Sequence, residues 1–329
     1  MSLRLTTSIC VSLLIASSAA PLRAGQVVIK IATVAPRGSM WMRLMDKMKA
    51  KILKETGGAV KLHYFPGQVQ GDERDVVRKM RTGQLQGGAF TAIGLSLINP
   101  KALVLQMPRI VRDQQHFDRM RKELHDLFAR SFIEKGYVLL GWAELGPIHI
   151  FSDRSIKSLS ELRKQKVWVW TDDAIAKALM RELKISPRQL GLPQVLPAMN
   201  TGIINTVYNS PLGLLAVQWH SKTRFLSEKP FAIGVGATVI TKKSFDKLSS
   251  EQQKKLLEIS FKYHEAMIKR SRKDNLRAAK ALLGNFKFKA MKLAAKDEQA
   301  FNAAAEKVAK SFVPRYFPKA LLDKVRAVK

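Results

Sequence analysis

The chain has 329 residues, of which 46% are hydrophobic and 25% charged, an ordinary composition for a folded protein, and its length favours two domains. The formal net charge of +31 is unusual, but the lysines and arginines are spread along the whole chain and aromatic residues do not alternate with them as a base-stacking surface requires. We therefore interpret the charge as a solvated basic surface and expect no nucleic-acid partner.

The first 24 residues have the pattern of a secretory signal peptide. Arg4 precedes an apolar run over residues 9–16, and small residues lead to Ala24. A mitochondrial transit peptide is the alternative, but it would carry more basic residues. The run is too short to span a bilayer. Cys10, the only cysteine, lies inside it without the small residues of a lipidation site. We expect a periplasmic, non-lipidated protein whose mature chain has no disulfide.

From residue 27 onward, strand and helix patterns alternate. The elements expected in the first half are a strand at 27–36, a helix at 39–58, a strand at 59–66, a helix at 71–84, a strand at 87–93, a helix at 117–136 and a strand at 137–145. This order is typical of a parallel sheet with helices packed on it.

A second group of strands and helices begins near Gly146. Its expected elements are strands at 148–153, 166–170 and 202–211, helices at 158–165 and 172–184, and a strand pair or one long kinked strand at 231–245. A pattern that stays helical over 249–283 is long enough to span two lobes. We predict a first lobe of residues 25–145 and 232–270, and a second lobe of 146–231 and 271–329.

Motifs of catalysis are missing from the sequence. The six histidines have no metal-binding spacing, and Ile98 interrupts a nucleophile elbow after Ser96. Val239 stands where a dinucleotide fingerprint needs its third glycine. The pairs Asp72-Glu73 and Asp172-Asp173 are interpreted as charges at helix N-termini. We expect neither an enzyme nor a cofactor or metal. Two lobes and an export signal favour a protein that closes around a ligand.

Three segments together resemble the binding proteins of TRAP transporters, the DctP-like family. They are TGGAVKLHYFPGQVQGDERDVVRKMRTGQLQGG, SIKSLSELRKQKVWVW and MNTGIINTVYNSP. The resemblance covers residues 27–317 in order. It implies a two-lobed α/β periplasmic binding protein fold of the class II type, with hinge strands and a long helix that spans both lobes. It also implies delivery of a small ligand to a permease with small and large integral membrane subunits. We expect the binding protein itself to be a monomer.

Members of this family mostly bind organic acids, and the resemblance places an arginine for the ligand carboxylate at the fourth position of K-x-R-V. Trp168 stands at that position here, and Ile148 stands at the position of a second arginine. A family asparagine is kept as Asn209, whereas the preceding aspartate and glutamate become Asn205 and Tyr208.

An indole at the arginine position changes the expected ligand. It offers roughly 150–250 Å² of apolar area, a π face and one donor, but no charge. We therefore predict a ligand that is apolar or aromatic, or bound through a cation of its own. The predicted ligand-binding residues are Trp168, Trp170, Ile148, Tyr208, Asn209, Thr33, Phe90, Thr91, Trp142 and Trp219.

Several alternatives remain open at this point. Trp168 is also compatible with interdomain packing without ligand contact, Trp170 with a position beneath the loop, and Trp142 and Trp219 with the core. Arg37 or Arg188 in place of the missing arginine would allow an organic acid as ligand. A sensing subunit that feeds a receptor in place of a permease is a second class of function, and an enzyme on the same fold is a third.

Overall fold

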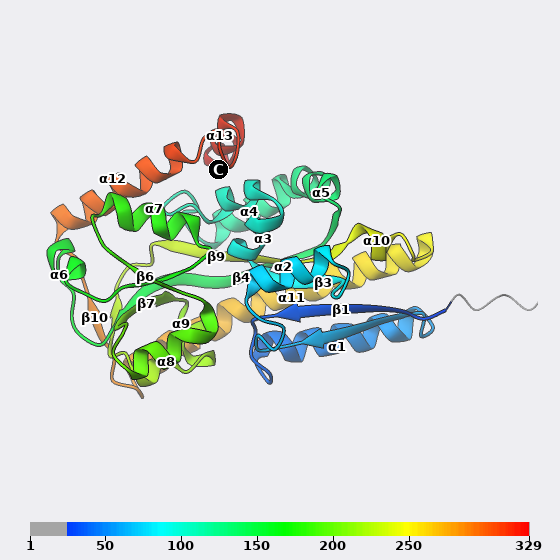
Figure 1. The fold of residues 1–329 in the computed structure, drawn as a ribbon, viewed down its shortest axis with the longest axis horizontal. Coiled ribbons are helices and arrows are strands. Elements are labelled where there is room, and N and C mark those ends of the chain that lie inside the picture. Colours follow the sequence, from blue (N-terminus) through cyan, green and yellow to red (C-terminus); the bar gives the residue numbers. More distant parts are fainter. Residues whose placement is uncertain (1–24, 329) are drawn as a thin grey trace, which may run out of the picture.

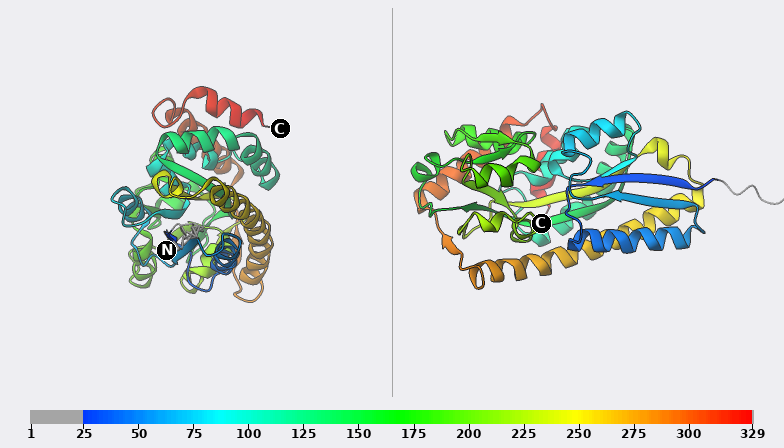
Figure 2. Two further views of the ribbon diagram at one scale, coloured as in Figure 1. Left: turned by 90° about the vertical axis from the view of Figure 1, so that its right-hand side faces the viewer. Right: turned by 60° about the horizontal axis from the view of Figure 1, so that its bottom comes forward.

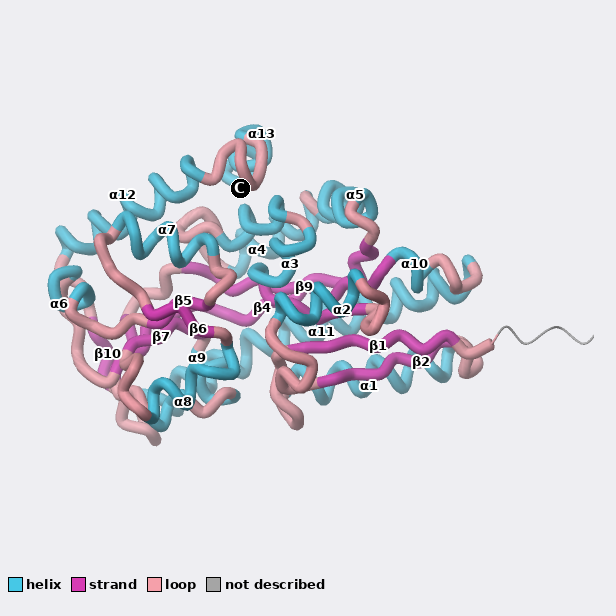
Figure 3. Tube along the Cα trace, viewed as in Figure 1, coloured by secondary structure: helices cyan, strands magenta, loops and turns pink. Residues whose placement is uncertain are grey.

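The computed structural model describes residues 25–328, so the predicted signal peptide over residues 1–24 lies outside the described residues. Two α/β lobes lie next to each other along the longest axis of the molecule (Figure 1). Strands run through the middle of both lobes and helices cover them on the outside (Figure 3). This is the two-lobed arrangement that the sequence predicts.

The strands carry the following bounds: β1 (Val27–Thr33), β2 (Val60–Phe65), β3 (Gly87–Thr91), β4 (Tyr137–Ser152), β5 (Trp168–Trp170), β6 (Arg188–Leu190), β7 (Thr206–Asn209), β8 (Phe225–Ser227), β9 (Ala232–Thr241) and β10 (Lys289–Met291).

The helices carry the following bounds: α1 (Met40–Glu55), α2 (Glu73–Arg81), α3 (Ala92–Ile98), α4 (Gln114–Glu123), α5 (His125–Glu134), α6 (Leu159–Arg163), α7 (Ala174–Glu182), α8 (Val195–Asn200), α9 (Pro211–Ala216), α10 (Lys242–Phe245), α11 (Ser250–Leu283), α12 (Ala295–Ser311) and α13 (Lys319–Ala327). Three 3-10 turns accompany them: η1 (Pro100–Gln106), η2 (Leu192–Gln194) and η3 (Trp219–Ser221).

One mixed sheet joins the two lobes. Its strand order is β10-β8-β4-β9-β3-β1-β2, and β7 pairs with β4. The expected parallel pairing holds for β1 with β2 and β3, but β9 is antiparallel to both β3 and β4. The long strands β4 and β9 pass from one lobe into the other, so they are the covalent connection around which the lobes can rotate.

The predicted break between two strands near Gly146 is wrong, because β4 is continuous from Tyr137 to Ser152. The register with β9 shifts between Leu139 and Gly141 and again between Glu144 and Gly146, where Gly146 has a φ of +107°. A glycine inside a strand often marks a bulge of this kind, and here its turn-like signal was misinterpreted as a boundary.

The single helix expected over 117–136 is also wrong. It consists of α4 and α5, which are separated at Leu124, whose φ of −101° and ψ of 2° leave the helical range. Leu124 is fully buried, so the break is fixed by tertiary packing.

Helix α11 begins after Ser249, whose side chain accepts a hydrogen bond from the Gln252 N–H in a capping box, as the sequence predicts. It packs on β4, on α1 of the first lobe and on α9 of the second. Figure 2 shows α11 running along most of the length of the molecule. Near the chain end, α13 packs on η1 and Arg112 donates to the Val328 carbonyl.

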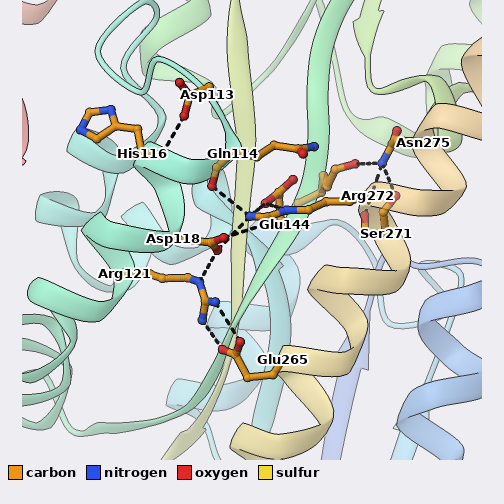
Figure 4. Close-up of polar contacts among 11 residues, drawn as sticks. Asp113, Gln114, His116, Asp118, Arg121, Glu144, Glu265, Ser271, Arg272 and Asn275 are labelled. Carbon is orange, nitrogen blue, oxygen red and sulfur yellow. Dashed lines mark hydrogen bonds and ion pairs between the residues drawn. The ribbon is translucent and has the colours of Figure 1, made fainter. Parts of the chain in front are cut away.

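Behind the sheet, α4, β4 and α11 are joined by ion pairs around the buried Glu144 (Figure 4). Arg272 of α11 donates to Glu144 of β4 at 2.6 Å and to Asp118 of α4 at 2.7 Å. Arg121 donates from Nε to Asp118 at 3.0 Å and from its guanidinium to Glu265. Burial raises the pKa of Glu144, and the Arg272 guanidinium opposes that shift. We call these five residues the hinge ion cluster.

Candidate functional site: the cavity between the lobes

A cavity of about 180 Å³ lies between the two lobes. The ends of several strands contribute to its walls, among them Thr33 of β1, Thr91 of β3, Trp170 of β5 and Asn209 of β7. Ligands of open α/β sheets bind outside the carboxyl ends of the strands, and each of these residues ends its strand. The cavity is therefore the candidate ligand site.

Trp168 lies in the wall of this cavity and is 1% exposed. Its ring stacks on Tyr208 with centroids 4.9 Å apart, and it meets Trp219 edge-on at 5.2 Å. The indole N–H donates to the Leu190 carbonyl at 3.1 Å. Because this bond uses its single donor, Trp168 offers the cavity carbon surface alone.

Trp170 lies two residues further along β5 and also lines the cavity. Its ring centroid is 6.3 Å from that of Trp168, in agreement with the strand alternation that places both indoles on one face. Its N–H donates to Oδ2 of Asp72 in the first lobe at 2.8 Å. Trp170 therefore both lines the cavity and contacts the other lobe.

Tyr208 and Asp173 form a buried polar pair in the wall. The Tyr208 hydroxyl donates to Asp173 Oδ2 at 2.7 Å and accepts from the Trp170 backbone N–H at 3.3 Å. Asp173 also caps α7 by accepting from the Ala176 N–H at 2.8 Å. Burial raises the pKa of Asp173 and raises the pKa of Tyr208 well above its usual value. Both polar ends are therefore engaged by the protein.

Asn209 and Ile148 complete the wall on the second lobe. Asn209 Oδ1 accepts from the Ser210 N–H at 2.8 Å, which leaves the amide nitrogen as the group that a ligand can meet. Ile148 reaches the cavity because of the register shift in β4. Leu145 lines the cavity before the shift and Ile148 after it, so the extra residue changes which side chains face inward.

Thr33, Phe90 and Thr91 line the cavity from the first lobe. Thr91 caps α3, and its N–H and hydroxyl donate to the buried Glu73 carboxyl at 2.6 and 2.7 Å. Gly94 N–H adds a third hydrogen bond to Glu73 at 2.7 Å. Burial raises the pKa of Glu73 to about 8 despite these donors. Glu73 was interpreted as a simple helix-end charge, but its side chain crosses to support the cavity wall.

The structure places the two remaining predicted tryptophans differently. Trp219 lines the cavity, whereas Trp142 does not: it packs edge-on against Phe128 of α5, with centroids 5.6 Å apart. Strand alternation explains this, since Ala143 and Leu145 face the cavity and Trp142 faces the opposite side of β4.

Neither candidate arginine reaches the cavity. Arg37 and Arg188 are both exposed, and neither belongs to the walls. Among the described residues, no lysine or arginine lines the cavity; its titratable side chains are Asp173, Tyr208 and His264. Burial lowers the pKa of His264 to about 4, so this ring is neutral at pH 7. The walls therefore carry no cation.

Many residues of the walls were not predicted from the sequence, among them Trp41, Gln106, Leu145, Asp173 and His264. The position of Asp173 in the sequence could have indicated a place at the cavity, because a helix cap directly after a strand lies at the ligand-binding edge of a sheet. The others come from helices and strand interiors, where a single sequence does not show which face is turned to a cavity.

Within residues 25–328 no group of histidine, cysteine, aspartate and glutamate side chains has a geometry that would hold a metal ion. A search of the same residues for a helix long and apolar enough to cross a bilayer found none.

The sequence model of the family DctP, described as bacterial extracellular solute-binding protein, family 7, matches residues 31–315. This chain belongs to that family. Its members are solute receptors and not enzymes, and the resemblance stated from the three sequence segments is confirmed.

Relatives of this DctP-family chain carry names that state their ligands. The ectoine/5-hydroxyectoine-binding periplasmic protein UehA of Ruegeria pomeroyi is 24% identical over 63% of this chain and 62% of its own length. The sialic acid-binding periplasmic protein SiaP of Vibrio cholerae is 23% identical over 73% of this chain and 75% of its own. The chain spans 62–65% of the length of the first curated relatives it matches.

Solved structures resemble the fold over nearly the whole molecule. DctP7 of Bordetella pertussis, a receptor that binds pyroglutamic acid, superposes with a TM-score of 0.83 at 16% identity, covering 91% of this chain and 99% of that one. A TRAP binding protein of Xanthobacter autotrophicus with bound β-D-galacturonate gives a TM-score of 0.83 at 19% identity, covering 92% of this chain and 100% of that one. At these identities the comparison shows the fold, which confirms the predicted architecture.

Proposed function

We propose that this protein captures a small, largely apolar or aromatic ligand between its lobes in the periplasm and delivers it to a TRAP-type permease with small and large membrane subunits. Family membership supports the transport role. The ligand class is supported by one observation: Trp168 forms the wall where the family resemblance expects an arginine, and no lysine or arginine lines the described cavity.

An anionic ligand would be poorly held by these walls. Moving a carboxylate out of water without a cationic partner is unfavourable by several kcal/mol. Two polar groups of the same walls, the Tyr208 hydroxyl and the Asp173 carboxyl, already hydrogen-bond to each other. What the cavity offers is aromatic and aliphatic surface with the Asn209 amide as a neutral donor, which suits a ligand with an apolar body and one neutral acceptor.

The competing proposal is an organic acid, and it is favoured by the relatives, whose names include pyroglutamic acid, galacturonate and sialic acid. It requires a basic side chain to enter the cavity. Arg37 and Arg188 are exposed and would have to move to do so.

Identification of the ligand that accompanies the protein separates the two proposals. The protein purified from its own host is measured by native mass spectrometry, and the bound molecule is extracted and identified. We expect a neutral aromatic or apolar compound. Recovery of a sugar acid or a small carboxylic acid would overturn the apolar proposal and leave the transport role standing.

A substitution tests the physical basis. Trp168→Arg restores a guanidinium at the wall, so calorimetric titration with pyroglutamate and galacturonate should show binding that the parent lacks. Trp168→Met is the control, because it opens similar space without a charge. Acid binding by the parent, or no binding by a folded Trp168→Arg variant, would count against the lost-arginine account.

A further inference from the structure

The two lobes touch beside the cavity through Asp72, the residue that precedes α2. Its Oδ1 accepts from the Glu73 N–H at 2.8 Å and caps the helix. Its Oδ2 faces the second lobe, where it accepts from the Trp170 indole N–H at 2.8 Å and from the Leu192 N–H at 3.0 Å. One carboxylate thus serves its own helix with one oxygen and the other lobe with the second.

Two neighbouring features strengthen this contact. Arg74, two residues further along α2, forms a bidentate ion pair with Asp172 of the second lobe, and its Nε lies 3.0 Å from Asp172 Oδ2. Gly191 allows the second lobe to approach, because a Cβ at this position would lie 3.0 Å from Asp72 Oδ2. The same helix end and the same short segment of the second lobe therefore meet at two independent places.

Trp170 connects this contact to the ligand cavity. One side of its indole lies in the cavity wall beside Trp168, and its N–H is the donor to Asp72. Its backbone N–H is held by the Tyr208 hydroxyl, which is itself bonded to Asp173. The position of the Trp170 ring is therefore tied to the arrangement of the two lobes.

We propose that Asp72 is an interlobe latch: it positions Trp170 as a wall of the closed cavity and stabilises the closed arrangement of the lobes. The proposal does not depend on the identity of the ligand. Hydrogen bonds to a charged group are strong enough that loss of the latch should raise the ratio of open to closed protein by roughly 10- to 100-fold.

The latch can be removed without loss of the helix cap. Asp72→Ser keeps a good N-cap residue, but its hydroxyl is too short to reach the second lobe. Trp170→Phe keeps a smaller aromatic ring in the wall and removes the indole donor. The matched control is Asp75→Ser, because the Asp75 carboxylate accepts from the Asp72 N–H and pairs with Arg78 within the same helix.

Lobe closure is measured by double electron–electron resonance in the full chain carrying Cys10→Ser, with nitroxides at the exposed positions Lys47→Cys of α1 and Arg181→Cys of α7. The parent and the Asp75→Ser variant should show one closed distance. Asp72→Ser and Trp170→Phe should each add a second, distinct population.

The double variant is expected to open little further than Asp72→Ser alone, because Asp72→Ser already loses the bond to Trp170 together with the bond to the Leu192 N–H. Circular dichroism establishes that each variant is folded. A parent that is already open, or an Asp72→Ser distance distribution identical to that of the parent, would overturn the proposal. So would additive opening in the double variant, since it would mean that the two residues act separately.

Discussion

The hinge ion cluster and the ligand cavity lie on opposite sides of β4, and carboxyl groups have different partners in the two regions. In the cluster, Arg272 lies between the carboxylates of Glu144 and Asp118. In the cavity, the Asp173 carboxyl is held by a hydroxyl and backbone donors. Strand alternation separates the two, since Glu144 faces one side of β4 while Ala143 and Leu145 face the other.

The same long helix supplies both regions. Helix α11 presents His264 and Met267 to the cavity and, one to two turns later, Arg272 to the cluster. Lysine and arginine side chains therefore lie behind the sheet and on the surface, and among the described residues none lines the cavity.

The largest expected effect comes from breaking the cluster. Arg272→Met leaves the buried Glu144 carboxylate without its partner, which should lower the free energy of unfolding by about 3–5 kcal/mol in urea titration at pH 7. Because burial already raises the pKa of Glu144, the deficit should shrink as the pH falls and the carboxyl is protonated.

Arg270→Met is the matched control for this prediction. Arg270 lies on the same helix but pairs with Asp274 at the surface, with its side chain 48% exposed. Surface pairs of this kind contribute about 0–1 kcal/mol. An equal loss in both variants would mean that the cluster has no special role.

The second effect concerns the protonation of His264 in the cavity wall. His264 is buried, with Nδ1 2.7 Å from the Ser260 carbonyl and Nε2 2.8 Å from the Thr238 hydroxyl, and its pKa is lowered to about 4 by burial. A histidine whose folded pKa lies below the unfolded value near 6.5 stabilises the fold above pH 6.5, and this stability is lost as the pH falls through 6.5 toward 4.

Between pH 7 and pH 4 the parent should therefore lose about 3 kcal/mol more of its free energy of unfolding than His264→Gln does. Denaturant titrations of both proteins at the two pH values measure the difference. Parallel losses in parent and variant would show that His264 does not carry this pH dependence.

The third and smallest effect concerns the polar pair of the cavity. Tyr208→Phe removes the donor to the buried Asp173 carboxyl, and we expect a loss of about 1–3 kcal/mol in the free energy of unfolding. Tyr64→Phe is the control, since the Tyr64 hydroxyl is buried without a hydrogen-bond partner and its removal should be neutral or stabilising. A similar loss in both variants would mean that the Tyr208 bond is unimportant.

Part of the cavity wall was predictable from local pattern and family resemblance. The alternation of residues 166–170 places Trp168 and Trp170 on one face, and both line the cavity together with Tyr208 and Asn209. Trp142 has the same residue type and lies in the same kind of strand, yet it belongs to the core. Residue type gave no means of telling these indoles apart, because the side of β4 that faces the cavity is set by bulges and by the neighbouring helices.

The sequence by itself determined the two groups of strands and helices and the long capped helix, since both follow from short-range periodicity and spacing, whereas the indole at an arginine position is what the family resemblance implies. Only the tertiary structure decided that β4 is continuous, that Arg37 and Arg188 stay outside the cavity, and that Asp72 meets Trp170 across the lobes. Those outcomes depend on contacts between residues about 100 positions apart, and no local pattern encodes such contacts.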